Sequence, residues 1–380
     1  MKINIYGSTG VIGQKSLKLV NNYPNIKINL LLANNNFKKL ISQSIKYKPK
    51  YICIKNSKYY EYVKSKIPKN VNIIKHNDLN LFLEKNFVEI SILAVSGYNA
   101  LLYFDSIINN TKFLGLVNKE VIVSAGHLFK KKKYIKSAKI FPIDSEHFSL
   151  FNFFNNYNYK LADIKKVYLT ASGGPFLNYN SNKLANVSVK EATNHPKWKM
   201  GKKNSIDSAT LANKCLELIE AHYLFDIPYN KLKILIHPES LVHSIVEFYN
   251  GISVFNYFYN DMDIPLINFF DYVMNKKSIN LKSQYFINKN FNLNFIKPDQ
   301  NNFPIYKIFN KVKNMEIEKK IMFNVINENA VELFTKNKIK FNDISKYVNK
   351  YLSLDLKMPI NNVNNIFKFK LYIKNKLDIK

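Results

Sequence analysis

The stretch Ile3-Asn4-Ile5-Tyr6-Gly7-Ser8-Thr9-Gly10-Val11-Ile12-Gly13 decides the fold of this 380-residue chain. Its apolar start predicts a buried strand, and the helical periodicity from Gln14 to Val20 predicts a helix. Glycines fill the turn between these two elements. Glycines let the backbone approach a phosphate, and the free N–H groups at a helix start attract its charge. The stretch therefore predicts a nucleotide site, although a tight turn without a ligand could have the same sequence.

Further strands alternate with helical segments along the first part of the chain. The predicted strands are residues 28–33, 51–54, 71–75, 90–95, 113–117 and 139–143. Repeated strand–helix units predict a Rossmann-like parallel sheet with helices on both faces. The second strand is followed by Asn34, Asn35 and Asn36, and Lys38 and Lys39 come next. Because no carboxylate stands there to bind a ribose, we expect NADPH as the cofactor.

The last of these strands runs into Asp144-Ser145-Glu146. Two carboxylates one residue apart, at the carboxyl edge of a sheet, suit a hard divalent cation such as Mg²⁺ or Mn²⁺. Asp and Ser are also good N-caps, so an ordinary helix start explains the same residues. Taken alone, this stretch favours the helix cap.

A second unit is predicted to begin with a strand at residues 166–170. That strand ends in Ser172-Gly173-Gly174-Pro175, a turn whose exposed N–H groups can form an anion nest. A polar loop follows and contains His195, Met200 and Trp198, the single tryptophan of the chain. Such a loop is either a functional lid or a packed surface loop.

A strong helix is predicted from residue 205 to residue 221, with Asp207 or Ser208 as its N-cap. Asn213, Glu217 and Glu220 are spaced by four and three residues, so they share one face of this helix. The face is either a solvated stripe or a functional surface. A strand at 232–236, a hairpin across 241–258 and a helix from Asp261 to about residue 275 follow, and the C-terminal segment is helical in its periodicity.

The composition limits the functions that the chain can have. The formal net charge is +30, and every basic side chain is lysine, because the sequence contains no arginine. Nucleic-acid binding would explain such a charge. However, the lysines are spread along the chain, and base readout prefers arginine, so we expect no nucleic-acid partner. The densest cluster, residues 130–133, is typical of a solvated helix face.

Two further features concern the compartment. Cys53 and Cys215 are far apart in sequence and form no disulfide framework, which favours a reducing cytoplasm. The first residues enter a strand directly, so we expect no signal peptide. No apolar run reaches the ~18 residues that span a bilayer, so we expect no membrane partner.

Taken together, the short motifs resemble those of the 1-deoxy-D-xylulose 5-phosphate reductoisomerase family, in the family's order and over nearly the whole chain. The motifs are Gly7-Ser8-Thr9-Gly10-x-Ile12-Gly13, Asn118-Lys119-Glu120, Pro142-x-Asp144-Ser145-Glu146-His147, Ser172-Gly173-Gly174-Pro175-Phe176, His195-Pro196-x-Trp198-x-Met200-Gly201, Asp207-Ser208-Ala209-Thr210-x-x-Asn213-Lys214-x-x-Glu217, Ile236-His237-Pro238-x-Ser240, Asp261-Met262 and Asn327-Glu328. Each motif is weak alone, and the set is specific.

The resemblance implies an enzyme that rearranges 1-deoxy-D-xylulose 5-phosphate and reduces it with NADPH to 2-C-methyl-D-erythritol 4-phosphate, in the non-mevalonate isoprenoid pathway. It implies a divalent metal, Mg²⁺, Mn²⁺ or Co²⁺, and a homodimer. We expect four domain segments: an NADPH-binding domain at 1–144, a catalytic domain at 145–275 with a lid loop at 172–203, a linker at 276–302 and a C-terminal helical domain at 303–380.

The resemblance also implies residue roles. The implied metal ligands are Asp144, Glu146 and Glu217, which with Lys119 form the catalytic set. The implied substrate contacts are Lys119, Ser145, Glu146, Ser172, His195, Trp198, Ser208, Asn213, Lys214 and Glu217. The implied cofactor contacts are Gly7, Thr9, Gly10, Val11, Ile12, Asn34, Asn36, Asn118, Glu120 and Gly201.

Some positions depart from the family pattern. The family usually has Gly-Lys-Asn where this chain has Asn34-Asn35-Asn36, so the contact to the 2′-phosphate of NADPH is in doubt. Ala94 replaces a usual glycine, and Asp263 replaces a usual basic residue. The alternatives are a Rossmann dehydrogenase with other chemistry, a nucleic-acid-binding protein and a decayed enzyme. The intact acids and the His-Pro-x-Trp motif argue against the first and the last.

Overall fold

The structure is a computed structural model that describes residues 1–129, 138–179, 181–197, 201–275 and 292–377. These residues form two compact units. The first unit contains residues 1–121, 138–148 and 261–275. The second contains the rest of the described chain.

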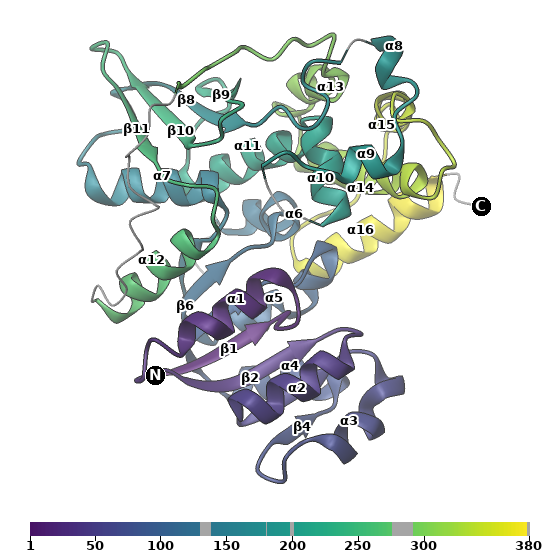
Figure 1. Ribbon diagram of the computed structural model, residues 1–380. Helices are drawn as coiled ribbons and strands as arrows, with labels where there is room; N and C mark the ends of the chain where they lie inside the picture. Colours follow the sequence, from purple (N-terminus) through teal and green to yellow (C-terminus); the bar gives the residue numbers. More distant parts are fainter. Residues whose placement is uncertain (130–137, 180, 198–200, 276–291, 378–380) are drawn as a thin grey trace. The chain divides into compact units, whose positions relative to one another are not determined.

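The first unit is built on a seven-stranded sheet in the order β4-β3-β2-β1-β5-β6-β7, and all neighbours in it are parallel (Figure 1). The neighbours β1 and β5 are not consecutive in the chain, so the strand order reverses between them, where such sheets bind ligands. The strands are β1 Lys2–Tyr6, β2 Lys27–Ala33, β3 Tyr51–Ile54, β4 Asn72–Ile74, β5 Val88–Leu93, β6 Thr111–Leu116 and β7 Lys139–Pro142.

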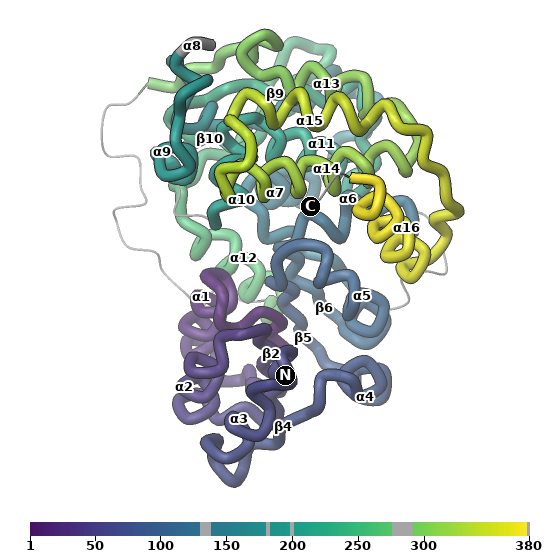
Figure 2. The backbone as a smooth tube through the Cα atoms, turned by 90° about the vertical axis from the view of Figure 1, so that its right-hand side faces the viewer, coloured from purple at the N-terminus to yellow at the C-terminus, as the bar shows by residue number. Residues whose placement is uncertain are grey.

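Helices cover both faces of this sheet. Figure 2 shows α1 and α2 on one side of the strands and α4 and α5 on the other. The helices of the first unit are α1 Val11–Val20, α2 Phe37–Tyr47, α3 Tyr60–Lys66, α4 Leu79–Lys85, α5 Leu101–Ile108 and α12 Asp263–Met274, with the short 3₁₀ helices η1 Ser57–Tyr59, η2 His76–Asp78 and η3 Gly97–Ala100. The predicted Rossmann-like α/β arrangement is confirmed.

Helix α12 belongs to the first unit although it is distant in sequence. The Phe269 ring lies 5.3 Å from the ring of Phe141 in β7. A Cβ on Gly115 of β6 would lie 3.1 Å from the Phe269 ring, so the ring fills the space that this glycine leaves. The Tyr23 hydroxyl donates to Asp271 at 3.0 Å. Burial of these rings therefore brings α12 to the sheet.

The second unit contains a mixed four-stranded sheet in the order β11-β10-β8-β9. Strands β8 and β9 are parallel, while β10 is antiparallel to both β8 and β11. Its strands are β8 Ile164–Ala171, β9 Leu232–Ile236, β10 Val242–Phe248 and β11 Ser253–Tyr257. The predicted hairpin is confirmed, with Gly251 at φ +88° in its turn.

Helices make up most of the rest of this unit. They are α8 Ser181–Leu184, α9 Val189–Thr193, α10 Lys202–Ala209, α11 Ala212–Phe225, α13 Pro304–Val312, α14 Ile317–Thr335, α15 Asp343–Leu352 and α16 Val363–Lys376. Helices α6 Lys119–Phe129 and α7 Ser145–Asn156 begin with first-unit residues and continue with second-unit residues. The predicted C-terminal helical region is confirmed by α13 to α16.

The prediction of one helix from 205 to 221 is wrong. The chain forms α10 and α11 with a break at Thr210 and Leu211, where Leu211 takes the left-handed φ of +62°. The Thr210 hydroxyl accepts from the Ala212 N–H at 3.3 Å, a local bond that competes with helix continuation. Asp207 and Ser208 consequently lie in the last turn of α10 and not at an N-cap.

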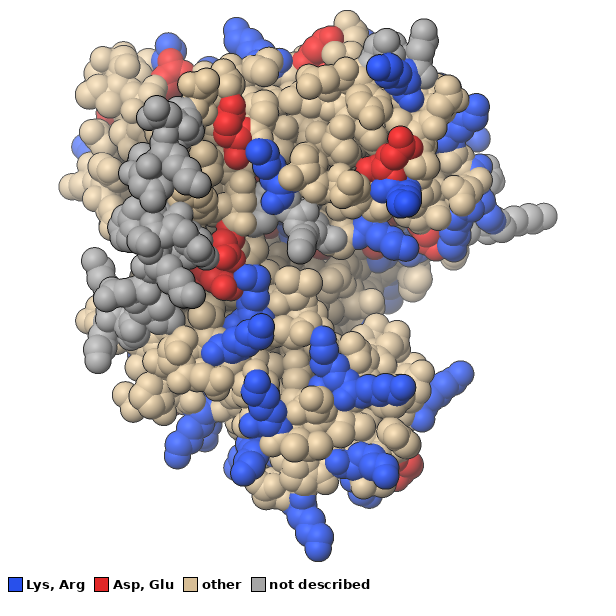
Figure 3. All heavy atoms as spheres, viewed as in Figure 1, with Lys and Arg blue, Asp and Glu red and all other residues tan. Residues whose placement is uncertain are grey.

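Other expectations are refined. The polar segment after residue 177 includes α8 and α9, and Ser188 and Glu191 form a capping box at α9. Residues 276–291 of the predicted linker lie outside the described residues, and Ile296 pairs with Ile236 of β9. Among the described helices, none combines the length and apolarity needed to cross a membrane. Figure 3 shows lysines dispersed over the visible face, without a single basic stripe.

Candidate active site

The turn between β1 and α1 leaves no room for side chains at two glycines. A Cβ on Gly13 would lie 2.3 Å from the Gly7 carbonyl oxygen, and one on Gly7 would lie 2.5 Å from the Ala94 carbonyl oxygen. Gly10 is the N-cap of α1 and offers no side-chain bond, so the first N–H groups of this helix lack a capping partner. The turn is therefore a preformed cradle for an anion.

Side chains from neighbouring helices hold this turn. The Ser8 hydroxyl donates to Gln43 Oε1 at 2.8 Å, and Gln43 Nε2 donates back to the Ser8 carbonyl at 2.8 Å. Gln14 Nε2 donates to the Thr9 carbonyl at 2.8 Å. The sequence analysis did not find Gln43, because nothing in its spacing links it to a turn 35 residues away.

The asparagines after β2 are exposed at the same edge of the sheet. Asn36 Oδ1 accepts from the Lys39 N–H at 3.2 Å and so caps α2. Asn35 Oδ1 accepts from Asn56 Nδ2 at 3.0 Å. Lys39 Nζ donates to Gln14 Oε1 at 2.8 Å, which brings this amine to the helix that follows the glycine turn. The side chains described at this edge are thus neutral or basic, which suits a ribose that carries a phosphate group.

Asn118 joins two strand-end loops. Its Nδ2 donates to the carbonyls of Val95 at 2.7 Å and Gly97 at 2.9 Å, and its Oδ1 accepts from the Val121 N–H at 2.7 Å. All three bonds are to backbone atoms. Asn118 therefore connects the loops that follow β5 and β6. The motif alone did not predict this structural role. Glu120 is buried in the first turn of α6.

Asp144 caps a helix and also keeps part of its carboxylate exposed. Its Oδ1 accepts from the Glu146 N–H at 3.3 Å, so the residue does cap α7. The same carboxylate forms an ion pair with Lys119 and lies 3.3 Å from Nδ1 of the buried His147. Its side chain keeps 17% exposure. Ser145 donates to Glu146 Oε2 at 2.6 Å. The acids are therefore accessible to a cation as well as structural.

In the second unit, three side chains that suit an anion contact one another, and we call this cluster the anion seat: Ser172, His195 and Ser208. His195 Nε2 lies 2.9 Å from the Ser172 hydroxyl and 3.1 Å from the Ser208 hydroxyl. The Gly174 N–H donates to the Ser172 oxygen at 3.1 Å. The cluster thus combines residues that are separated in sequence. They come from the turn after β8, from the polar segment after residue 177 and from α10.

The seat contains a neutral histidine. Burial, followed by the charge of Lys214, lowers the pKa of His195 to about 4. The Lys197 N–H donates to Nδ1 at 3.2 Å, so in the neutral ring the proton is assigned to Nε2, which donates to a serine oxygen. The serine hydroxyl protons are then free to point toward an anion.

Helix α11 adds charged groups next to this seat. Lys214 Nζ lies 2.7 Å from Glu217 Oε2, and Asn213 Nδ2 donates to Glu217 Oε1 at 2.5 Å. Glu217 and Glu220 are 1% and 4% exposed, so the solvated-stripe interpretation of this helix face is wrong. Asn213 and Lys214 lie in the first turn of α11, where the helix dipole favours an anion.

Two predicted residues, Trp198 and Met200, lie outside the described part of the chain. Gly201 is exposed and is the N-cap of α10.

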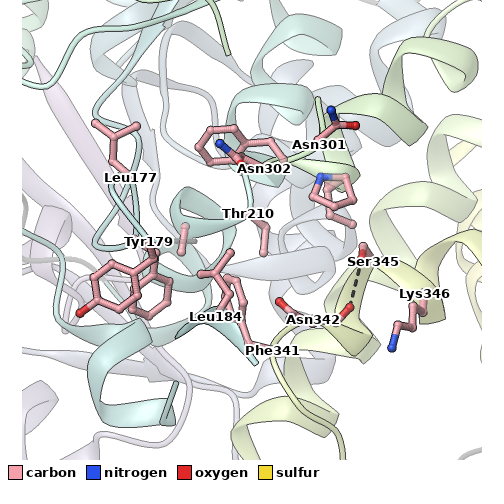
Figure 4. A pocket seen from close by; sticks show the side chains of 15 residues that line it. Leu177, Tyr179, Leu184, Thr210, Asn301, Asn302, Phe341, Asn342, Ser345 and Lys346 are labelled. Atoms are coloured by element: carbon pink, nitrogen blue, oxygen red, sulfur yellow. Dashed lines mark hydrogen bonds between the residues drawn. The ribbon is translucent and has the colours of Figure 1, made fainter. Parts of the chain in front are cut away.

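A cavity of about 230 Å³ borders two of the segments that carry the seat (Figure 4). Ala209 and Thr210 line it from the end of α10, and Phe176 and Leu177 line it from the turn after Ser172. Phe341 and Ser345 contribute from the start of α15.

A doubly wound sheet with a glycine cradle, in a chain that also builds an anion seat, defines a dinucleotide-dependent α/β enzyme that acts on a phosphorylated substrate. Three family models match: "1-deoxy-D-xylulose 5-phosphate reductoisomerase" over residues 3–126, its C-terminal domain over 140–225 and "DXP reductoisomerase C-terminal domain" over 259–376. The reductoisomerase of Pelagibacter ubique is 40% identical over 352 residues, with 90% of this chain and 89% of the relative covered. The chain belongs to the 1-deoxy-D-xylulose 5-phosphate reductoisomerase family.

Solved structures agree with this assignment. A reductoisomerase in complex with NADPH, fosmidomycin and magnesium is 30% identical, with a TM-score of 0.86 over 99% of this chain and 97% of that one. The enzyme from Zymomonas mobilis in complex with NADPH is 28% identical, with a TM-score of 0.87 over the same shares.

Proposed function

We propose that this chain converts 1-deoxy-D-xylulose 5-phosphate to 2-C-methyl-D-erythritol 4-phosphate with NADPH and a divalent cation. The observation that carries the proposal is the seat of Ser172, neutral His195 and Ser208, a set of donors suited to a phosphate monoester. Family membership supplies the reaction. Lys214 and Asn213 in the first turn of α11 complete the proposed phosphate contacts.

The glycine turn suits a dinucleotide, because Cβ atoms at Gly7 or Gly13 would collide with backbone atoms and force this tight turn open. We propose that Thr9, Gly10, Val11 and Ile12 hold the pyrophosphate. Bound NADPH supplies the hydride for the reduction. Proposed contacts at the two ends of the cofactor are Asn34 and Asn36 on one side, and Asn118, Glu120 and Gly201 on the other.

Asp144, Glu146 and Glu217 are the proposed metal ligands. Their carboxylate oxygens are the donors that Mg²⁺ and Mn²⁺ prefer. A bound cation supplies a Lewis acid that polarises the substrate carbonyl. Lys119, which pairs with Asp144, is the residue proposed to neutralise charge, and Ser145 is proposed to bind a substrate hydroxyl. Trp198 and Met200 are the proposed cover that excludes water during hydride transfer.

Three further proposals rest on the family resemblance and the composition. The protein is a homodimer, and its compartment is the cytoplasm, since Cys53 and Cys215 are both buried free thiols. The domain boundaries are those given above, at residues 144, 275 and 302.

The test is incubation with 1-deoxy-D-xylulose 5-phosphate, NADPH and Mg²⁺ or Mn²⁺, with loss of the nicotinamide absorbance as readout. We expect turnover that stops when the metal is chelated. 1-Deoxy-D-xylulose without the phosphate is the matched control, and it should lose most of kcat/KM. No oxidation of NADPH by folded protein would overturn the proposal.

A further inference from the structure

Two motif residues, Asp207 and Asn327, have no part in the site described so far. Asp207 lies in α10 and is 1% exposed, and Asn327 lies in α14 and is fully buried. Asn327 Nδ2 donates to Asp207 Oδ1 at 2.8 Å, and Lys203 Nζ lies 2.7 Å from the other carboxylate oxygen, Oδ2. Both oxygens of a buried carboxylate are therefore satisfied, one of them by a residue 120 positions away.

Burying the polar side chains of Asp207 and Asn327 costs free energy, so we expect the hydrogen bond between them to have a structural role. Removing a carboxylate and an amide from water is unfavourable unless both are well bonded. Among the described residues, the Asn327 Oδ1 atom has no hydrogen-bond partner. The bond that Nδ2 donates to Asp207 is therefore the interaction that offsets burial of this amide. An apolar residue would fill the same position in α14 without that cost.

The residue after Asp207 is Ser208, whose hydroxyl oxygen lies 3.1 Å from His195 Nε2 in the anion seat. The end of α10 borders the cavity of Figure 4 through Ala209 and Thr210. The helix also stops there, at the left-handed Leu211. The bond from α14 thus ends on the residue next to Ser208.

We propose that Asn327 is a positioning residue: through Asp207 it fixes the rotation and height of α10, and so the direction of the Ser208 hydroxyl toward the substrate phosphate. Figures 1 and 2 both show α10 beside α14. The inference rests on the proposed phosphate role of the seat. It adds that a C-terminal helix, with no substrate contact of its own, sets the affinity for the phosphate group.

The experiment measures the dissociation constant of inorganic phosphate from the His195 ring resonance, together with Tm, in full-length protein. We expect Asn327→Leu to weaken phosphate binding about 10-fold, because a Ser208 hydroxyl that is no longer directed at the phosphate loses a hydrogen bond to a charged group. The KM for the sugar phosphate should rise by a similar factor, with kcat changed far less.

Glu328→Gln is the matched control, since Glu328 is the next residue in the same motif and pairs with Lys370 at 3.4 Å. Its phosphate affinity should stay within about twofold, whatever happens to its Tm. The double variant Asp207→Asn with Asn327→Asp reverses the donor and acceptor, and it should recover most of the affinity that Asn327→Leu loses.

Three outcomes would overturn the inference: a lower Tm for Asn327→Leu with unchanged phosphate affinity, an equal loss of affinity in Glu328→Gln, or no recovery in a folded double variant. If Asn327→Leu does not fold, the double variant decides alone. A wild-type protein that binds phosphate but does not turn over the sugar phosphate would contradict the proposed function. The effect of Asn327→Leu on phosphate binding would still test this inference.

Discussion

Replacing Gly13 with alanine tests whether the glycine turn is the cofactor cradle. A Cβ at this position would lie 2.3 Å from the Gly7 oxygen and 2.6 Å from Ser8 Cα, both of them backbone atoms. Real Cβ contacts are not shorter than 3.0 Å, so the turn must open by several tenths of an ångström. Overpacking of this kind costs about 1–3 kcal/mol.

The opening also moves the first N–H groups of α1 away from the pyrophosphate. A hydrogen bond to a charged group contributes about 1.5–3 kcal/mol, so the loss of one such bond weakens NADPH binding about 10- to 100-fold. The assay is an NADPH titration followed by nicotinamide fluorescence, with urea unfolding of the free protein in parallel.

Gly10→Ala is the control for stability. Its Cβ would lie 3.3 Å from the Gly7 oxygen, and its φ of −74° suits alanine. Gly10→Ala should therefore lower the free energy of unfolding much less than Gly13→Ala does. The reasoning is refuted if Gly13→Ala folds with unchanged stability and binds NADPH within about twofold of the wild type.

Three other predictions follow from single sites. Titration of His195 by NMR should give a pKa near 4 in the folded protein, against about 6.5 in the unfolded chain. The contribution of His195 to the free energy of unfolding should therefore be complete above pH 6.5 and be lost as the pH falls toward 4. A pKa of 6 or above in the folded protein would contradict the burial argument. Glu217→Gln should abolish metal-dependent turnover while the protein stays folded, and near wild-type rates with the same metal response would exclude Glu217 as a ligand. Asn35→Lys should tighten NADPH about 10-fold but not NADH, since the added ammonium meets only the 2′-phosphate; equal effects on both cofactors, measured by the same fluorescence titration, would argue against that site.

Local patterns in the sequence identified much of this architecture. The strand–glycine–helix start and the repeated apolar runs predicted the parallel sheet, because strand burial and helix periodicity are short-range properties. Motif order predicted the family, and the alternation around Tyr249-Asn250-Gly251 predicted the hairpin. Turn chemistry was less visible: the break at Thr210 and Leu211 depends on one hydroxyl bond within an otherwise helical pattern.

Contacts between distant segments could not be predicted in the same way. The sequence left Asp144 as either a cap or a ligand, and the structure shows one carboxylate oxygen capping α7 while the side chain also pairs with Lys119. Likewise, the solvated stripe that remained possible for Glu217 and Glu220 is excluded by their burial.

The sequence by itself determined the class of fold, the glycine turn after the first strand and the family, because these follow from local periodicity and from motifs read in order. Only the tertiary structure decided that His195 is neutral between two serines, that Gln43 holds the glycine turn, and that Asn327 reaches Asp207. The physical reason is that pKa values, desolvation and side-chain hydrogen bonds depend on groups that packing brings together.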